Sequence, residues 1–189
     1  MRMLLASLLF FLWVNPVAAQ KPAPTGAPHK PSAPLDRLAG NWETRARFWN
    51  STDPSAPPTE CTATVNANMI MGGRFLFQKV TGQCMGQPLE AIGVIGYDDA
   101  TGRYEATSFS NMGTGISLHV GERNDAGDIV LHLSYQDQST GATVNRRTVR
   151  TMISENEWIE IAYETRSGAD KKVMEIRARR SNASVPSRP

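Results

Sequence analysis

Short segments in which apolar and polar residues alternate follow one another along most of the chain. Turn residues separate them at intervals of about ten to fifteen positions, and no window shows a convincing helical period. Such segments bury one face of each β-strand, because alternate side chains point to opposite sides. We expect ten strands, at Gly40–Trp49, Glu60–Met71, Arg74–Cys84, Leu89–Asp98, Arg103–Ser110, Gly115–Arg123, Asp128–Gln136, Ala142–Ile153, Glu157–Thr165 and Lys172–Arg179.

The turns between these segments carry residues that suit hairpins. Gly72 and Gly73 can both adopt the positive φ angles of a two-residue turn. The turns at 99–102 and 124–127 each end in a glycine, as many hairpin turns do. The pattern predicts an all-β fold, an antiparallel up-and-down β-barrel of about ten strands, because closure removes exposed edges. A sandwich of two sheets is the alternative.

The two ends of the chain differ in composition from the part between them. Residues 1–19 combine Arg2, an apolar run and small residues at the end, the pattern of a secretory signal peptide. Residues 20–34 form a Pro/Ala-rich disordered linker and residues 181–189 a disordered tail, which leaves 35–180 as one folded domain. No later segment is long and apolar enough to span a membrane. We therefore expect a periplasmic or secreted protein.

The composition argues against several classes of function. The 189 residues include 20 Lys and Arg against 18 Asp and Glu, so a nucleic acid is not an expected partner. Two cysteines are too few for a four-cysteine zinc site. Motifs for nucleotide binding, zinc proteases and serine hydrolases are missing, so we assign no cofactor and no catalytic residue. The length fits one domain, which we expect to be a monomer or a dimer.

The two cysteines test the predicted hairpin at Gly72 and Gly73. In that hairpin Met71 faces Arg74, and the same register places Cys61 opposite Cys84. Directly opposed residues on neighbouring strands have Cα separations that suit a disulfide. We expect this bridge, with a structural role; a redox role would favour a CxxC spacing that the chain lacks.

Several sequence blocks, in order along the predicted domain, resemble the domain-of-unknown-function family 1579. They are Leu38-Ala39-Gly40-Asn41-Trp42 with Phe48-Trp49 after it, Met71-Gly72-Gly73-Arg74-Phe75-Leu76, Gly93-Val94-Ile95-Gly96-Tyr97-Asp98, Asn111-Met112-Gly113-Thr114-Gly115 and Val173-Met174-Glu175-Ile176. The resemblance implies a lipocalin-like (calycin) barrel and no particular activity. Its Gly-x-Trp element also resembles the first lipocalin strand, which implies that Trp42 plugs the closed end of the barrel.

Two histidines lie in the predicted domain, on strands joined by one hairpin. His119 and His132 both alternate with apolar neighbours such as Leu118 and Leu131. This alternation predicts that both histidines lie on the outer, solvated face, so we assign no metal site. It also argues against haem binding of the nitrobindin type, which uses a histidine inside the barrel.

A pair of arginines provides the candidate ligand site. A four-residue turn at 154–157 would put Ile159, Ile161 and Tyr163 in the core and point Arg146 and Arg150 into the barrel beside Tyr163. Buried guanidinium groups need partners. One alternative is an internal carboxylate such as Glu90. Another is an anionic ligand held by the arginines and the tyrosine hydroxyl. A register slip of one residue would turn both arginines outward.

These observations favour an exported, non-catalytic barrel that binds a small, partly apolar, anionic molecule such as a lipid or carboxylate. Arg146, Arg150 and Tyr163 would hold its polar end, and Phe48, Ile159 and Ile161 would line the apolar part. An enzyme of the isomerase or hydrolase type with Asp98 or Glu90 as a base at the barrel mouth is one alternative. An envelope scaffold with Trp49 and Trp158 as contact points is the other.

Overall fold

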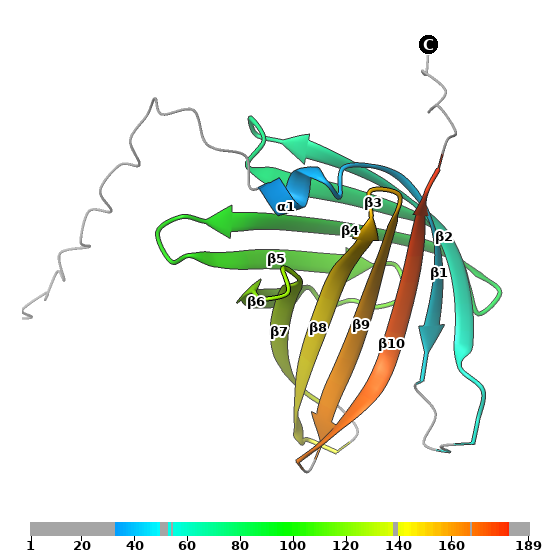
Figure 1. Cartoon of the computed structure of the whole chain (residues 1–189). Coiled ribbons are helices and arrows are strands. Elements are labelled where there is room, and N and C mark those ends of the chain that lie inside the picture. Colours follow the sequence, from blue (N-terminus) through cyan, green and yellow to red (C-terminus); the bar gives the residue numbers. More distant parts are fainter. Residues whose placement is uncertain (1–32, 50–52, 54, 138–139, 167, 182–189) are drawn as a thin grey trace, which may run out of the picture.

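The computed structural model describes residues 33–49, 53, 55–137, 140–166 and 168–181. Its elements are α1 (Ala33–Asp36), β1 (Gly40–Phe48), β2 (Thr59–Ile70), β3 (Phe75–Cys84), β4 (Gln87–Asp98), β5 (Arg103–Ser110), β6 (Ser117–Arg123), β7 (Ile129–Gln136), β8 (Thr143–Ser154), β9 (Glu157–Arg166) and β10 (Ala169–Arg180). Each strand pairs antiparallel with the next, and β10 pairs with β1 (Figure 1). The predicted closed up-and-down barrel of ten strands is confirmed.

The predicted ends of the chain fall largely outside this description. The expected signal peptide at 1–19, most of the linker at 20–34 and the tail from residue 182 are not among the described residues. The folded part begins slightly earlier than expected, because Ala33 and Pro34 already belong to α1. Among the described residues, no helix has the length and apolar character needed to cross a bilayer.

Trp42 lies at the centre of a buried aromatic contact inside the barrel. Its side chain is fully buried and packs edge-to-face on Trp158, with ring centroids 6.0 Å apart. Its indole Nε1 donates a hydrogen bond of 2.9 Å to the carbonyl of Leu38, which follows α1. Leu35 and Leu38 are also fully buried in this core, and the Arg180 guanidinium lies 4.2 Å from the Trp42 ring centroid. Trp42 and Trp158 thus lie together in the buried core of the barrel.

The disulfide joins Cys61 and Cys84, as the hairpin register predicts. These two residues are direct partners of β2 and β3, with Cα atoms 4.4 Å apart. The turn is longer than predicted, because Met71, Gly72 and Gly73 all have positive φ and the strands resume at Phe75. Its residue count is even, so the predicted pairing is unchanged. A disulfide of this kind fits an oxidising compartment.

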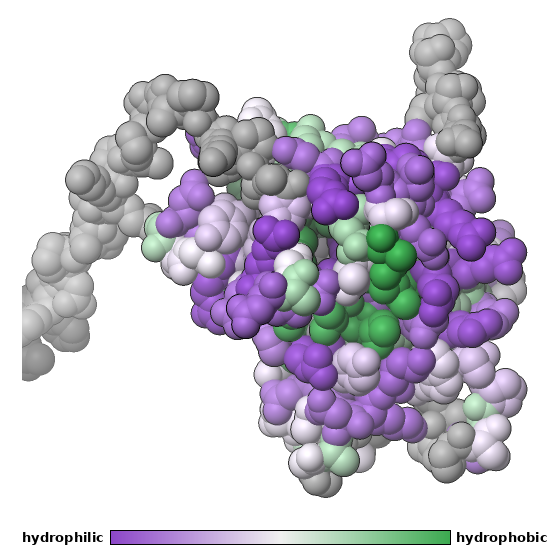
Figure 2. Space-filling model, in the orientation of Figure 1, coloured by the Kyte–Doolittle hydropathy of each residue, from purple (hydrophilic) through white to green (hydrophobic). Residues whose placement is uncertain are grey.

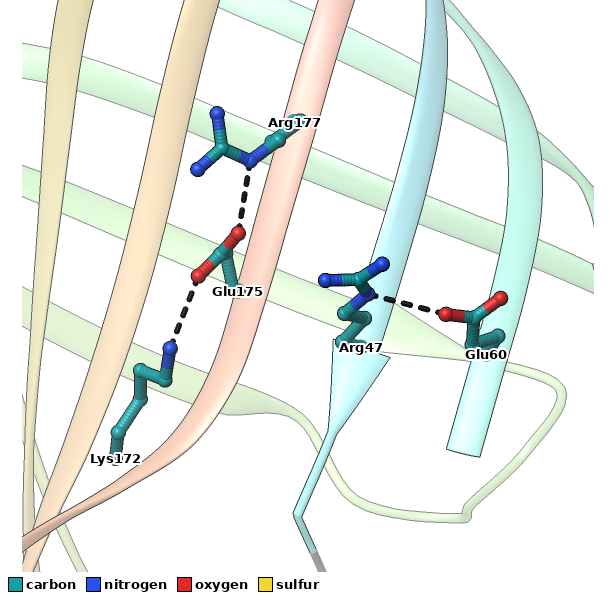
Figure 3. Close-up of polar contacts among 5 residues, drawn as sticks. All are labelled: Arg47, Glu60, Lys172, Glu175 and Arg177. Atoms are coloured by element: carbon teal, nitrogen blue, oxygen red, sulfur yellow. Dashed lines mark hydrogen bonds and ion pairs between the residues drawn. The ribbon is translucent and has the colours of Figure 1, made fainter. Parts of the chain in front are cut away.

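The outer surface of the barrel carries several ion pairs and an apolar patch. Figure 3 shows Glu175 of β10 between Lys172 and Arg177, and Arg47 of β1 paired with Glu60 of β2. Figure 2 shows a hydrophobic patch over β8 and β9 on an otherwise mainly hydrophilic face. Val149 and Ile161 are direct partners on the outer face of β8 and β9, and Ile159 lies on the same face.

β6 is oriented with its apolar side chains outward. Leu118 is 68% exposed and Ile116, just before the strand, is 67% exposed, while His119 and Gly121 lie on the inner side. The ladder between β6 and β7 is short: it pairs Val120–Arg123 with Ile129–His132 and no further. The half of β6 that begins at Ser117 is therefore bound to the barrel through β5 alone.

Candidate functional site

A cavity of about 240 Å³ lies inside the barrel, next to the core that contains Trp42. One wall is formed mainly by apolar side chains and the disulfide on β1 to β4 and β10, among them Ala46, Phe48, Cys61, Val65, Val80, Leu89, Ala91 and Ile176. Arg150, Glu160, Gln78, Thr44 and Ser108 contribute polar groups to the lining. The cavity can thus accommodate a molecule with one apolar and one polar part.

The charged side chains of the interior come from β8 and β9, where arginines and glutamates face one another. Arg146 and Arg150 lie four residues apart on β8, directly opposite Glu164 and Glu160 of β9. All four side chains lie on the inner face, because they alternate with the outward-facing row that contains Val149 and Ile161. Two arginine–glutamate pairs therefore line the interior, and their formal charges sum to zero.

The deeper pair is Arg150 with Glu160. Nε of Arg150 donates to Oε2 of Glu160 at 2.6 Å, and the side chains are only 16% and 11% exposed. The guanidinium also lies 5.0 Å from the ring centroid of Trp158, in the range of a cation–π contact. Its Nη1 makes a long contact of 3.5 Å with Oε1 of Gln78. This last contact is longer than the hydrogen bond that Arg150 makes with Glu160.

The outer pair is Arg146 with Glu164. Nε and Nη2 of Arg146 both donate to Oε1 of Glu164, at 3.1 and 2.5 Å. The hydroxyl of Tyr135 donates to the same oxygen at 2.8 Å, and the Arg146 guanidinium lies 5.6 Å from the Tyr135 ring centroid. Arg146 is 33% exposed, so this pair is closer to solvent than the first.

The predicted register of β8 and β9 was wrong by one residue, although both arginines do point inward. Ser154 pairs with Glu157, but a bulge before it makes Met152 the partner of Trp158. Beyond the bulge each β8 residue therefore faces a partner one position earlier than predicted. Arg150 faces Glu160 rather than Ile161, so the predicted interior position of Ile161 is incorrect.

Two other predicted site residues, Ile159 and Tyr163, lie outside the barrel for the same reason. Ile159 and Ile161 lie on the outer face of β9, and the ring centroid of Tyr163 lies 4.7 Å from the guanidinium carbon of the outward-facing Arg147. Glu90 was named as the internal carboxylate, but it is exposed, and Glu160 and Glu164 take that role. Phe48 does line the cavity, as predicted.

His119 also differs from the prediction, because it lies inside the barrel. Its Nδ1 atom is buried and has no hydrogen-bond partner among the described residues. Burial lowers the pKa of the imidazole, with nearby Glu160 acting in the opposite direction and Arg146 and Arg150 adding to the decrease. His132 is exposed on the outer face, as predicted. The sequence argument against an interior histidine, and with it the argument against haem, therefore loses its basis.

A second hollow, of about 390 Å³, opens at the mouth of the barrel beside the cavity. It is lined by Phe109, Met112, Ile116 and Ser117, and it shares Ala91 and Ser108 with the inner cavity. Ser108 pairs with Ser117 across β5 and β6. The hollow therefore adjoins both the apolar wall and the strand that carries His119.

Residues named for the alternative functions occupy other environments. Asp98 accepts hydrogen bonds from Thr101 and Ala100 in the β4–β5 turn, and the Thr101 hydroxyl is the main cause of its lowered pKa. A lowered pKa weakens a carboxylate as a general base. Trp158 was expected to be exposed, but it is buried at 3%. Trp49 is half-buried with the Lys172 ammonium 4.2 Å from its ring centroid.

The sequence contained signals for the residues that the prediction missed. The spacing of Arg146 and Arg150 on β8 matches that of Glu160 and Glu164 on β9, which suits two cross-strand ion pairs. The inward position of His119 was not predicted, because its neighbours Leu118 and Val120 look like residues of a core face. In the described part of the chain, no three His, Cys, Asp or Glu side chains are grouped to hold a metal ion.

Comparison with known proteins supports the fold. Protein Rv2717c of M. tuberculosis has a TM-score of 0.55 at 18% identity, with 79% of this chain and 96% of that chain covered. The S-type phycobiliprotein lyase CPES of Guillardia theta has a TM-score of 0.54 at 11% identity, with 80% and 93% covered. A de novo designed fluorescence-activating β-barrel reaches 0.44 at 15% identity, with 78% and 96% covered.

These identities are low enough that the structural likeness concerns the barrel alone. No curated protein matches the chain. The family model described as "Protein of unknown function (DUF1579)" matches residues 27–180, which is most of the sequence and all ten strands. The chain therefore belongs to the DUF1579 family.

Proposed function

We propose that this protein binds one small amphipathic carboxylic acid inside its barrel and performs no covalent chemistry on it. The single observation that supports the proposal best is the two-sided cavity. Its apolar wall runs from Phe48 to Leu89, and Arg150 and Gln78 contribute polar groups to the rest of the lining. The structural neighbours share only the barrel, so the proposal rests on this geometry.

The size of the cavity limits the ligand. Sites for drug-sized ligands usually measure about 300–1,000 Å³. A cavity of about 240 Å³ suits a smaller molecule, such as a short- or medium-chain acid. A longer chain would extend past Ala91 and Ser108 into the hollow at the mouth.

The internal ion pairs determine how an acid would bind. Arg150 already holds Glu160, so a ligand carboxylate competes with Glu160 and does not meet a free cation. The long contact between Arg150 Nη1 and Gln78 is the one that a ligand oxygen would replace. We expect moderate affinity, because part of the arginine's hydrogen-bonding capacity is already used.

Export to the periplasm or the medium belongs to the same proposal. The Cys61–Cys84 disulfide supports it, since such bonds persist in oxidising compartments. Fractionation of cells that express the full chain tests this part separately. Recovery in the cytoplasmic fraction with free thiols would contradict it.

The binding test is calorimetry with the purified folded protein and acids of six to ten carbons, matched to alcohols and amines of the same length. We expect the acids to bind more tightly than the alcohols, and Arg150→Gln to remove the difference. Glu160→Gln should tighten acid binding about tenfold, or ~1.4 kcal/mol, because it removes the competing carboxylate. Arg147→Gln, on the outer face of the same strand, is the matched control.

Two results would overturn the proposal. One is the absence of binding by every acid in the series. The other is equal acid binding by the wild type and Arg150→Gln, which would show that the acid lies elsewhere.

A further inference from the structure

The outer face of β3, β4, β5 and β6, which neighbour one another in the barrel (Figure 1), exposes several large apolar side chains. Phe75 is 41% exposed, Phe109 44% and Leu118 68%. The first two alternate along their strands with Leu76 of the core and Ser108 of the cavity lining, so they point outward. Neighbouring exposed apolar side chains of this kind are typical of an interaction surface.

The strand register places these side chains in three neighbouring rows, which we call the β3–β6 face. The central row crosses the four strands through directly paired residues, and it consists of Phe77, Val94, Thr107 and Leu118. The row on the side of the mouth consists of Lys79, Ile92 and Phe109. The row on the opposite side consists of Phe75, Gly96, Glu105 and Val120. The face is therefore apolar at its centre, with one charged residue in each flanking row.

The size of the β3–β6 face limits the strength of any contact that it makes. Three rows about 6.8 Å apart on four strands about 4.8 Å apart cover about 400 Å². The Phe75 ring lies against the sheet over Gly96, because a Cβ atom there would be 2.5 Å from its Cδ1. A standard protein interface buries about 800 Å² on each partner, so a contact through this face should be weak and reversible.

The two charged residues lie on opposite sides of the central row. Lys79 and Glu105 are both exposed. Neither forms an ion pair within the part of the chain that the structure describes. A partner that covers the apolar row would therefore meet a cation along one flank and an anion along the other.

A second copy of the same face has the complementary arrangement. In a two-fold dimer both copies use the same surface, and the rotation axis lies in the interface. An axis along the central row brings that row onto its own counterpart and each flanking row onto the opposite one. Lys79 of one copy then lies over the row that carries Glu105 of the other, and the reciprocal pair forms across the axis. Equal charges in both flanking rows would repel instead.

We propose that the protein forms a reversible two-fold dimer through its β3–β6 face. The apolar central rows pack on each other, and Lys79 of each copy pairs with Glu105 of the other. The self-complementary charge pattern favours a second copy over a different partner. This inference is independent of the proposed function, because the interior site lies on the other side of the sheet.

The test is analytical ultracentrifugation of the purified folded protein between about 1 and 500 µM. We expect mainly monomer at the low end and mainly dimer at the high end, with a dissociation constant of about 10–100 µM. Leu118→Glu should weaken the dimer more than about tenfold, because the axis brings the new charge close to its own copy. Ile153→Glu, at a 58% exposed site on β8 outside this face, is the matched control and should change nothing.

A charge-reversal cycle tests the arrangement of the two copies. Lys79→Glu and Glu105→Lys should each weaken the dimer about tenfold, because each change places like charges across the interface. The double variant exchanges the two charges and should recover most of the affinity of the wild type. A double variant that stays as weak as the single ones would contradict the proposed arrangement.

Other results would overturn the dimer itself. One is a wild type that stays monomeric up to about 500 µM. Another is a dimer that Leu118→Glu and both single charge variants leave intact. A monomer that binds phosphatidylcholine vesicles, and loses this binding in Leu118→Glu, would assign the face to a lipid surface instead. Should Leu118→Glu not fold, the charge-reversal cycle still decides the question, since both of its residues are exposed.

Discussion

Glu160 accepts a hydrogen bond of 2.6 Å from Nε of Arg150, its direct neighbour across β8 and β9 inside the barrel. The same guanidinium lies 5.0 Å from the ring centroid of Trp158, which packs on Trp42. The polar wall of the cavity is therefore joined to the aromatic core. Changes in either region should affect the other.

Removing the carboxylate alone should destabilise the protein strongly. Glu160→Leu leaves the Arg150 guanidinium, which is 16% exposed, without its anionic partner. Breaking a buried pair in this way costs about 3–5 kcal/mol. The double variant Arg150→Met/Glu160→Leu should recover most of the loss in a urea unfolding experiment. Simple addition of the two single effects in the double variant would show that the pair is not coupled.

The disulfide should contribute about 2–4 kcal/mol to the free energy of unfolding. It joins residues 23 positions apart and closes the β2–β3 hairpin near the cavity. A reducing agent should lower the melting temperature of the wild type but not that of Cys61→Ala/Cys84→Ala. Equal melting temperatures for the oxidised wild type and the double variant would contradict the expected contribution.

Trp42→Ala should be among the most destabilising single substitutions, at about 3–5 kcal/mol. The indole is fully buried, and the substitution also leaves the Leu38 carbonyl without its side-chain partner. Leu118→Ser, at a site that is 68% exposed, should change stability by less than about 0.5 kcal/mol. Both effects can be measured by denaturant unfolding followed by tryptophan fluorescence. A small effect of Trp42→Ala would mean that the core repacks without the indole.

Stability should decrease on mild acidification because of His119. Burial lowers its pKa in the folded state, so the unfolded chain binds the proton more readily. The contribution is complete above the unfolded pKa of about 6.5 and is lost as the pH falls through the folded value. His119→Phe should flatten the profile in this range, measured by urea unfolding at a series of pH values.

Glu175, a carboxylate on the outer face, also affects the dependence of stability on pH, but at a lower pH than His119. The hydrogen bond from Lys172, and next the one from Arg177, lower the pKa of Glu175 below its usual value of 4.5. Its contribution therefore persists above that value and is lost only at lower pH. Because Arg177 is 61% exposed, solvent screens the pair and the effect should be small.

Near neutral pH the expected slope of stability against pH belongs to His119. If the His119→Phe variant kept the slope of the wild type in this range, the titration would belong to another group.

The architecture could be predicted because local rules determine it. Alternation located the ten strands, and the even count of residues in the turn after Ile70 placed Cys61 opposite Cys84. Such a register follows from the turn alone when no bulge intervenes.

The site was predicted less well because it depends on departures from those rules. The bulge before Ser154 shifts the rest of the β8–β9 ladder by one residue, and no residue type near Ser154 predicts a bulge there. On β6 the apolar residues face outward, so the usual assumption that the apolar face is the inner one placed His119 on the wrong side. A sequence rule that places apolar residues inside fails where the interior itself is polar.

The bulge in β8 decides which side chains of β8 and β9 share the inner face of the barrel. With it, Arg150 and Glu160 fall on the same side of the hairpin; a regular ladder from the same turn would place them on opposite sides. One further residue gained or lost in that turn would replace the inward-facing Glu160 by its neighbours Ile159 and Ile161, while Arg146 and Arg150 stayed inside and all ten strands kept their order. Barrels of identical topology can therefore differ completely in what they hold, through a change in loop length that no comparison of overall shape would detect.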